Sequence, residues 1–327
     1  MKNIAIIMGG YSSEYQISLK SGNVVYQFLD KSKYNGYRIH IFKEKWVYVT
    51  DENLEFPVDR NDFSVTVDGT KITFDAVFNA IHGTPGEDGL MQAYFELLNI
   101  PQSSCDYYQA ALTFNKRYTV AVASFAGMHV AKSLHLFRES PLTAGEILQQ
   151  LQLPVFVKPN NGGSSLGMSK VNEPAALEPA LVKAFKEDSQ VLVEEYISGR
   201  EFTIGVFKTK GNIVALPITE VITKNEFFYF QAKYEGASEE ITPAKVDEVI
   251  ADKIRAEAKK AYTVFNCRGV VRIDFIYNEA SGKAHMLEIN TVPGQSAASI
   301  VPQQVRAMGW SLKEFYSALI EECFNRN

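Results

Sequence analysis

Residues 269–290 read GVVRIDFIYNEASGKAHMLEIN, and this stretch decides the fold of the C-terminal third of the chain. The apolar runs from Gly269 to Tyr277 and from His285 to Ile289 have the pattern and length of two strands. A helical pattern covers roughly Pro243 to Phe265 before them, and a last helix is expected from about Ser311. The C-terminal third is therefore predicted to combine strands with helices.

Four polar side chains stand on the two predicted strands. Because side chains alternate along a strand, Arg272 and Asp274 share one face of the first. Glu288 and Asn290 share one face of the second. If the strands pair as a hairpin, the four groups converge, and their carboxylate and amide oxygens are hard ligands of the kind that Mg²⁺ takes with waters and phosphates. The alternative is a solvated strand face with an Arg–Asp ion pair.

The segments before this stretch predict two more domains in a mixed α/β (α+β) chain. The middle third holds one helical and four strand patterns: Thr113 to Ala126, Leu153 to Lys158, Gly167 to Val171, Gln190 to Tyr196 and Glu201 to Phe207. The first third alternates strands and helices: Ile4 to Met8, Ser18 to Phe28, Tyr37 to Phe42, Ala76 to Ile81 and Gly89 to Leu98. Boundaries near Pro101 and in the Ser198-Gly199 turn predict an N-terminal α/β domain with an open parallel sheet at 1–101, a central domain at 102–198 and a C-terminal domain at 199–327.

A loop of Asn, Gly and Ser joins two of the predicted strands, and it reads KPNNGGSSLG from Lys158 to Gly167. Its glycines let backbone N–H groups approach phosphate oxygens, and Lys158 adds a positive charge. It is not a Walker A loop, since the order G-x-x-x-x-G-K-[ST] is absent and strands flank it on both sides. An ordinary hairpin connection is the alternative.

The strand that starts at Val191 ends in acidic residues before the Ser198-Gly199 turn. Its backbone and a carboxylate could contact the edge of adenine, with Glu201 on the ribose hydroxyls. A solvated strand end is the alternative interpretation.

Two loops follow apolar strands in the first third, Gly9 to Glu14 and His82 to Gly89. Ligands of open α/β sheets bind beyond the carboxyl ends of strands, so both loops could face one crevice. His82 could equally be a hydrogen-bonded structural histidine. The absence of G-x-G-x-x-G argues against a dinucleotide-binding oxidoreductase.

Composition excludes several other classes of protein. The 327 residues are 46% hydrophobic and 22% charged, which is typical of a soluble globular chain. A net charge of -5 argues against nucleic acid as a partner. The N-terminus lacks a signal-peptide pattern, and no apolar run is long enough for a membrane span. Cys105, Cys267 and Cys323 form no CxxC pair, so a reducing cytoplasm is expected.

The order and wording of these motifs resemble the D-alanine-D-alanine ligase family of ATP-grasp enzymes over nearly the whole chain. The matching segments are Met8-Gly9-Gly10 with Glu14, HGTPGEDG from His82, Asn115-Lys116, the 158–167 loop, Glu194 to Glu201, Ala232-Lys233-Tyr234, Arg272-Ile273-Asp274, and Glu288-Ile289-Asn290 through Pro293-Gly294 to Ser299-Ile300-Val301-Pro302. The LEINTVPG-type ending is highly specific. The resemblance implies an ATP-grasp fold and a cytoplasmic homodimer that joins two D-alanines through D-alanyl phosphate for peptidoglycan precursor synthesis.

The resemblance also implies a role for each matched residue. ATP would lie between the central and C-terminal domains, on Lys116, Lys158, Ser165, Glu194, the backbone of Glu195 and Ile197, Glu201 and Lys233. Two Mg²⁺, or Mn²⁺ in their place, would be held by Asp274, Glu288 and Asn290. The first D-alanine would meet Glu14, His82, Ser164 and Tyr234. Ser299 and Ile300 would hold the second, with Arg272 and the Gly294 N–H on the oxyanion.

The sequence departs from the family pattern at Gly162, at Glu195 and at Phe228 to Gln231. The segment Asn225 to Gly236 is expected to close over the site and bring Lys233 to the γ-phosphate. Two alternatives remain at this point: a ligase for another acceptor, such as D-lactate or a different amino acid, and a nucleotide-responsive binding protein without turnover.

Overall fold

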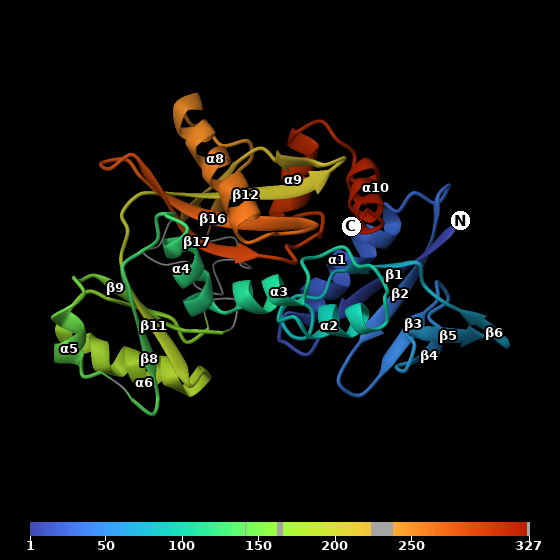
Figure 1. Ribbon diagram of the computed structural model, residues 1–327, viewed down its shortest axis with the longest axis horizontal. Coiled ribbons are helices and arrows are strands. Elements are labelled where there is room, and N and C mark those ends of the chain that lie inside the picture. The colour runs from blue at the N-terminus through green and yellow to red at the C-terminus, as the bar shows by residue number, and fades with distance from the viewer. Residues whose placement is uncertain (141, 162–165, 224–237, 326–327) are drawn as a thin grey trace.

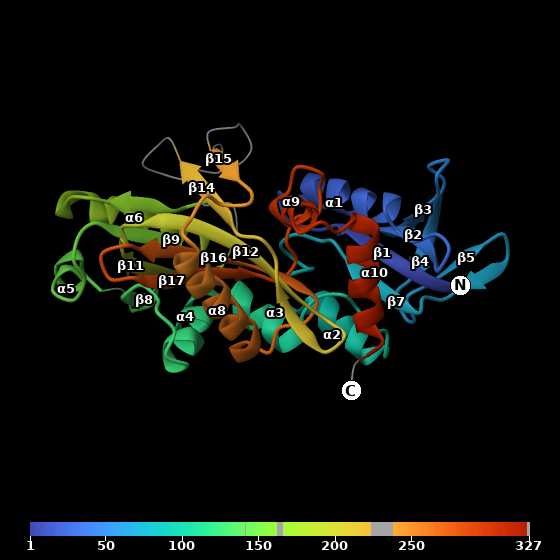
Figure 2. The same ribbon diagram turned by 90° about the horizontal axis from the view of Figure 1, so that it is seen from above.

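The computed structural model describes residues 1–140, 142–161, 166–223 and 238–325 (Figure 1). Within these ranges the chain forms three sheets in succession, of seven, four and six strands. Figures 1 and 2 both place the seven-stranded N-terminal sheet and the four-stranded central sheet at opposite ends of the molecule. None of the helices in these ranges has the length and the hydropathy that a membrane crossing requires.

The N-terminal sheet has the strand order β6-β5-β4-β3-β2-β1-β7. The expected parallel pairing is confirmed for three strands, β1 (Lys2–Gly9), β2 (Tyr34–Ile41) and β7 (Ala76–Asn79). The others form an antiparallel meander that the sequence did not reveal: β3 (Trp46–Val49), β4 (Glu55–Asp59), β5 (Ser64–Val67) and β6 (Thr70–Ile72). Two helices accompany this sheet, α1 (Tyr15–Gln27) and α2 (Leu90–Leu97).

The central sheet is antiparallel and has the order β10-β9-β11-β8. Its strands are β8 (Ser133–Phe137), β9 (Val155–Pro159), β10 (Ser169–Val171) and β11 (Gln190–Glu195). The helices α5 (Ala144–Leu148) and α6 (Leu177–Glu187), with the short 3₁₀ helix η1 (Pro174–Ala176), accompany it. Apolar residues of α6, including Leu177 and Ala184, pack into the core of this sheet with Val157 and Val193.

The third sheet has the order β15-β14-β12-β16-β17, and β13 pairs with β12. Its strands are β12 (Arg200–Thr209), β13 (Asn212–Ala215), β14 (Thr219–Thr223), β15 (Ser238–Ile241), β16 (Val270–Asn278) and β17 (Lys283–Asn290). The helix α8 (Glu248–Val264) packs on this sheet. The predicted long helix therefore begins at Glu248 rather than at Pro243.

The helical pattern from Thr113 to Ala126 forms two helices, not one. They are α3 (Tyr107–Phe114) and α4 (Lys116–Phe125), and they pack against β17 of the third sheet. Asn115 between them has an extended backbone and accepts a hydrogen bond from the Tyr118 N–H at 3.1 Å. An asparagine side chain that caps a helix in this way competes with helix continuation, which explains the break.

Two C-terminal helices connect the third sheet to the first. α9 (Ile300–Ala307) and α10 (Leu312–Cys323) share a hydrophobic core with β1, β7 and β12. Phe315 and Tyr316 of α10 are fully buried there, Phe207 contacts Phe315 and Phe78 contacts Tyr316. The N-terminal and third sheets are thus joined by a continuous core, and the domain boundaries near residues 101 and 198 stay a prediction.

Candidate active site

One cavity of about 1280 Å³ collects the predicted site residues. Every predicted site residue within the described ranges lines it: Glu14, His82, Lys116, Lys158, Glu194, Glu195, Ile197, Glu201, Arg272, Asp274, Glu288, Asn290, Gly294, Ser299 and Ile300. Ser164, Ser165, Lys233 and Tyr234, like the predicted closing segment Asn225 to Gly236, lie outside the described residues. Segments from all three sheets therefore contribute to one site.

The predicted hairpin is present, because β16 and β17 pair in antiparallel register. Asp274 stands opposite Glu288, and Arg272 stands opposite Asn290. The register shifts just beyond Asp274, where Phe275 pairs with Met286 and Leu287 is the extra residue. Leu287 lines the cavity beside Glu288, which simple strand alternation does not predict.

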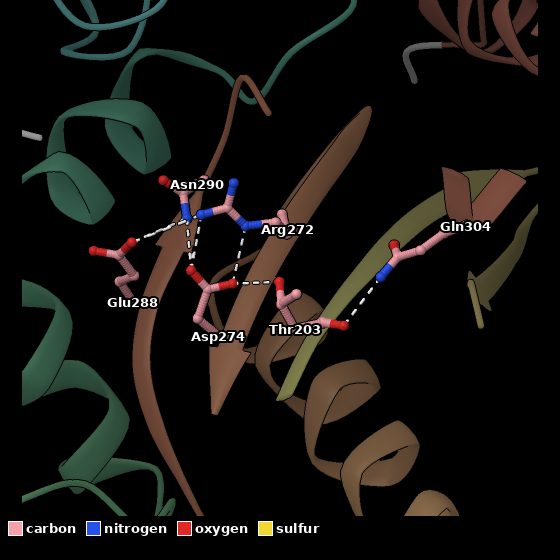
Figure 3. A network of polar contacts seen from close by, with 6 residues as sticks. All are labelled: Thr203, Arg272, Asp274, Glu288, Asn290 and Gln304. Carbon is pink, nitrogen blue, oxygen red and sulfur yellow. Dashed lines mark hydrogen bonds and ion pairs between the residues drawn. The ribbon is translucent and has the colours of Figure 1, made fainter. Parts of the chain in front are cut away.

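Arg272 and Asp274 form a bidentate ion pair on one face of β16 (Figure 3). The guanidinium Nε lies 2.9 Å from Oδ1 of Asp274, and a terminal nitrogen lies 2.8 Å from Oδ2. Burial disfavours the guanidinium charge, but Asp274, with help from Glu288, holds the pKa of Arg272 above its usual value. Arg272 is therefore a fixed positive charge in the wall of the cavity.

Asp274, Glu288 and Asn290 converge on the same side of the hairpin (Figure 3). The amide nitrogen of Asn290 lies 3.4 Å from Oδ2 of Asp274 and 3.4 Å from Oε1 of Glu288. Two carboxylates and an amide fit Mg²⁺ when phosphates and waters supply the other ligands. Among the residues that the structure describes, no group of three or more His, Cys, Asp or Glu side chains is arranged so that it could hold a metal ion by itself.

Thr203 on β12 is a site residue that the sequence interpretation missed. Its hydroxyl donates a hydrogen bond to Oδ1 of Asp274 at 2.5 Å, and its side chain lines the cavity (Figure 3). Strand alternation could have found it, because Thr203 follows Glu201 by two positions on the same strand.

At the other end of the cavity, Lys158 of β9 and Glu194 of β11 form an ion pair. Both side chains are largely buried, with 15% and 8% of their surface exposed. The two residues come from neighbouring antiparallel strands of the central sheet. A charged pair in this position gives the cavity one cation and one anion that a polar ligand could engage separately.

Asn160 fixes the start of α4 against the loop that follows β9. Its carbonyl oxygen accepts a hydrogen bond from the Lys116 N–H at 3.2 Å, and its Oδ1 accepts one from the Arg117 N–H at 2.8 Å. Asn160 itself is almost fully buried. Lys116 and Lys158 are therefore held in the same wall although they are far apart in the sequence.

The strand end after Glu194 uses part of its backbone for sheet structure. The Glu195 N–H donates to the carbonyl oxygen of Lys132 at 2.9 Å, and the Tyr196 N–H donates to that of Pro154 at 2.9 Å. A contact of Glu195 with a ligand would therefore use its carbonyl oxygen. The carboxylate of the Glu195 side chain accepts a hydrogen bond from the Gln152 N–H.

His82 links the N-terminal sheet to the segment after β17. Its Nε2 lies 3.0 Å from Oγ of Ser21, and its Nδ1 lies 2.9 Å from the carbonyl oxygen of Val292. Burial lowers the pKa of His82, so the ring is neutral at neutral pH. His82 thus combines a place in the cavity wall with the structural role that was its alternative interpretation.

Glu14 and Glu87 lie near His82 in the wall of the cavity. The Glu14 N–H donates to Oγ of Ser12 at 3.2 Å, and that hydroxyl donates to the His82 carbonyl at 3.0 Å. Glu87 accepts a hydrogen bond from the Gly83 N–H at 2.6 Å. Burial raises the pKa of Glu87 to about 7, and the nearby charge of Glu14 adds to this shift. Glu87 had no predicted role, although it lies in the same loop as His82.

The start of α9 completes the cavity wall. Ser299 is the N-cap residue of α9, and its Oγ lies 2.7 Å from Oγ of Ser296. A side chain at Gly294 would clash, because its Cβ would lie 2.7 Å from the Ser299 hydroxyl. Backbone N–H groups at a helix start favour anions, so this wall can hold a carboxylate.

The sequence is similar to those of known proteins. The model described as D-ala D-ala ligase N-terminus matches residues 3–105, and the model described as D-ala D-ala ligase C-terminus matches residues 115–321. A D-alanine--D-alanine ligase from Flavobacterium johnsoniae is 56% identical and covers 98% of this chain and 99% of its own. One from Christiangramia forsetii is 46% identical, with 99% of each chain covered.

Solved structures of other proteins resemble this chain over nearly its whole length. The VanG D-Ala:D-Ser ligase from Enterococcus faecalis superposes with a TM-score of 0.89 at 31% identity, covering 98% of this chain and 99% of that one. A D-alanine--D-alanine ligase from Bacillus anthracis complexed with ATP superposes with a TM-score of 0.79 at 26% identity, covering 99% and 98%.

Proposed function

Because the chain belongs to the D-alanine-D-alanine ligase family, we propose that it joins two molecules of D-alanine while ATP is cleaved to ADP and phosphate. The observation that carries the proposal is the single cavity, in which every described residue with a predicted role has a place. The reaction would run in two steps. The carboxylate of the first D-alanine attacks the γ-phosphorus, and the amine of the second then attacks the acyl phosphate and releases phosphate.

ATP would bind at the end of the cavity that the central sheet forms. Lys116 and Lys158 supply positive charge for the phosphates, and Asn160 holds both in one wall. Glu194 and the backbone beyond it would contact adenine, and Glu201 would contact the ribose. The Lys158–Glu194 ion pair has to separate for this, so each side chain exchanges one partner for another. Ser165 and Lys233 would add further contacts with ATP.

Asp274, Glu288 and Asn290 would hold Mg²⁺ together with the phosphate oxygens of ATP, and Mn²⁺ would serve the same ligands. The bound metal would supply charge neutralisation during phosphoryl transfer. Thr203 and Arg272 orient the Asp274 carboxylate before any ligand arrives. This preorganisation supports the metal role over that of a solvated strand face.

Glu14 would pair with the ammonium of the first D-alanine, with His82 beside it. The Glu14 backbone N–H is bonded to Ser12, and the His82 ring is bonded to Ser21 and Val292, so hydrogen bonds hold both residues in the cavity wall. Ser164 and Tyr234 would complete the subsite by the family resemblance.

The second D-alanine would place its carboxylate at the start of α9, on Ser299 and Ile300. Its amine would then face the acyl phosphate, and the oxyanion formed on attack would lie near Arg272 and the Gly294 N–H. The fixed charge of Arg272 supports this role, since a preorganised donor stabilises developing negative charge without reorganisation.

The decisive experiment incubates the purified chain with D-alanine, ATP and Mg²⁺ and measures all products. We expect D-alanyl-D-alanine, ADP and phosphate in equal amounts. AMP and pyrophosphate in place of ADP and phosphate would rule out the acyl-phosphate route. ATP cleavage without any dipeptide would favour the nucleotide-responsive binding protein.

A second acceptor is worth testing because a solved D-Ala:D-Ser ligase resembles the chain over its whole length. The assay should therefore offer D-serine and D-lactate singly beside D-alanine. A kcat/KM for either that exceeds the value for D-alanine would move the proposal to that acceptor. The cytoplasmic location, the homodimer and the role in peptidoglycan precursor synthesis and cell shape stay predictions.

A further inference from the structure

Gln304 on α9 is fully buried although its side chain is polar. Its Oε1 accepts a hydrogen bond from the Gly205 N–H at 2.9 Å. Its Nε2 donates to the carbonyl oxygen of Thr203 and to Oγ1 of Thr219, both at 3.0 Å. Both ends of the amide are paired, so this one side chain fixes α9 to the two strands β12 and β14.

The backbone of β12 is shaped to receive this amide. A Cβ at Gly205 would lie 2.9 Å from Oε1 of Gln304 and 2.6 Å from Cδ1 of Leu216. Only glycine lets the helix side chain and the strand approach this closely. The other buried residues of α9, such as Val301 and Val305, make apolar contacts. Apolar contacts have no preferred direction, so they do not fix the position of the helix along the strand as the amide does.

The hydrogen bonds of Gln304 connect the proposed acceptor site with the proposed metal ligand. The carbonyl oxygen of Thr203 accepts a hydrogen bond from the Gln304 amide. The Thr203 hydroxyl donates a hydrogen bond to Oδ1 of Asp274 at 2.5 Å (Figure 3). Ile300 at the start of α9 lies about one helical turn before Gln304. One connected path therefore runs from the proposed acceptor site at the helix start to the proposed metal ligand.

We propose that Gln304 is a positioning residue that sets the start of α9, and with it the acceptor, at a fixed place relative to Asp274. The inference rests on the proposed function, because it assigns the acceptor carboxylate to Ser299 and Ile300. Gln304 is not among the residues that line the cavity, and its effect is transmitted by the eight-residue helix.

The test compares two buried glutamines that differ in the segments to which they are hydrogen-bonded. Gln304→Met keeps length and flexibility but removes all three hydrogen bonds. Gln102→Met is the matched control, because Gln102 is also buried and satisfied, donating to the carbonyls of Ser104 and Cys105 and accepting from the Ser104 N–H. We expect Gln304→Met to raise the KM for the second D-alanine about tenfold, because small displacements of a bound group are costly. The KM values for ATP and for the first D-alanine should change less than about twofold, and the control should leave all three unchanged.

A second variant separates positioning from mere loss of packing. Gln304→Glu keeps the shape and an acceptor for the Gly205 N–H, and burial raises the pKa of the new carboxyl. Its neutral form can donate to the Thr203 carbonyl, whereas its ionised form cannot. The acceptor KM of Gln304→Glu, divided by that of the parent at the same pH, should therefore fall toward one as pH decreases.

An equal rise of all three KM values in Gln304→Met, or the same acceptor shift in Gln102→Met, would overturn the inference. A parent that forms no dipeptide would instead refute the proposed function. Hydrogen exchange then still tests Gln304. Amides of α9 after its first turn and of β12 around Gly205 should exchange faster in Gln304→Met and not in Gln102→Met. Exchange of both regions at the parent's rate in Gln304→Met would contradict the positioning role whatever the activity.

Discussion

The two ends of the cavity are organised in opposite ways. At the nucleotide end, Lys158 and Glu194 pair with each other, and both are expected to contact ATP. At the hairpin end, Asp274 is held by Arg272 and Thr203, neither of which is an expected metal ligand, and their bonds fix the orientation of its carboxylate. ATP must therefore separate the ion pair at the first end, whereas a metal at the second would bind a carboxylate whose orientation is already fixed. Substitutions should separate accordingly into effects on binding and effects on turnover.

The largest effect should come from Asp274→Asn at the hairpin end. Loss of this charge removes the proposed metal ligand and the partner of Arg272, so kcat should fall on the order of 100-fold or more even at saturating Mg²⁺. Asp252→Asn on the exposed face of α8 is the control, because it makes the same chemical change beside Arg255 outside the cavity. Near-parental kcat in Asp274→Asn would mean that the metal lies elsewhere.

At the nucleotide end, Lys158→Met should act chiefly on binding. We expect the KM for ATP to rise roughly 30-fold, since the variant would lose the proposed charge-assisted contact with a phosphate in a largely buried wall. Lys132→Met, an exposed lysine 4.0 Å from Glu195, should stay within about twofold. A variant that lost kcat while keeping its KM for ATP would erase the contrast between the two ends.

Thr203→Val tests how far Asp274 depends on the bond behind it. Valine matches threonine in shape but cannot donate to Oδ1, so kcat should fall about tenfold through a less well oriented carboxylate. Thr203→Ser retains the hydroxyl and should restore most of the rate. Steady-state kinetics of both variants decide this, and equal losses in the two would assign Thr203 a packing role only.

The smallest effect concerns stability and comes from Glu87, near His82. The folded-state pKa of Glu87 lies at about 7, above its ordinary 4.5. Between these pH values the folded state binds more protons than the unfolded state, so Glu87 makes stability fall as pH rises. Glu87→Gln should remove this slope, so the variant should be more stable than the parent at pH 8.

Urea unfolding of the parent and of Glu87→Gln between pH 4 and pH 8 measures the difference in their free energies of unfolding and its sign. His82, whose lowered pKa gives the opposite slope below its ordinary value, is present in both proteins. A variant less stable than the parent at pH 8 would show that the Glu87 carboxylate is charged and stabilising.

Local patterns in the sequence predicted the hairpin face, because alternation alone puts Arg272 and Asp274 on one side. They also located the strand ends that carry His82 and Glu194. The meander β3 to β6 was missed because its strands have only three to five residues and weak alternation.

The rest of the site depends on tertiary contacts that no local pattern contains. Gln304 sits in a helix that the sequence interpretation did not predict, and its partners on β12 and β14 lie 85 to 101 positions earlier. Leu287 enters the cavity only because the register of β16 and β17 shifts. The resemblance to a family was what joined the separate motifs into one expected site.

The pairing of β8 with β11 has a topological consequence. The chain leaves for the central sheet at Lys132 and returns at Glu195, and these residues are hydrogen-bonded to each other at 2.9 Å. Within the described residues, the core of the central sheet is built from positions 134–193 alone. The central sheet is thus an insertion with adjoining ends, which a short linker could replace without pulling the flanking segments apart.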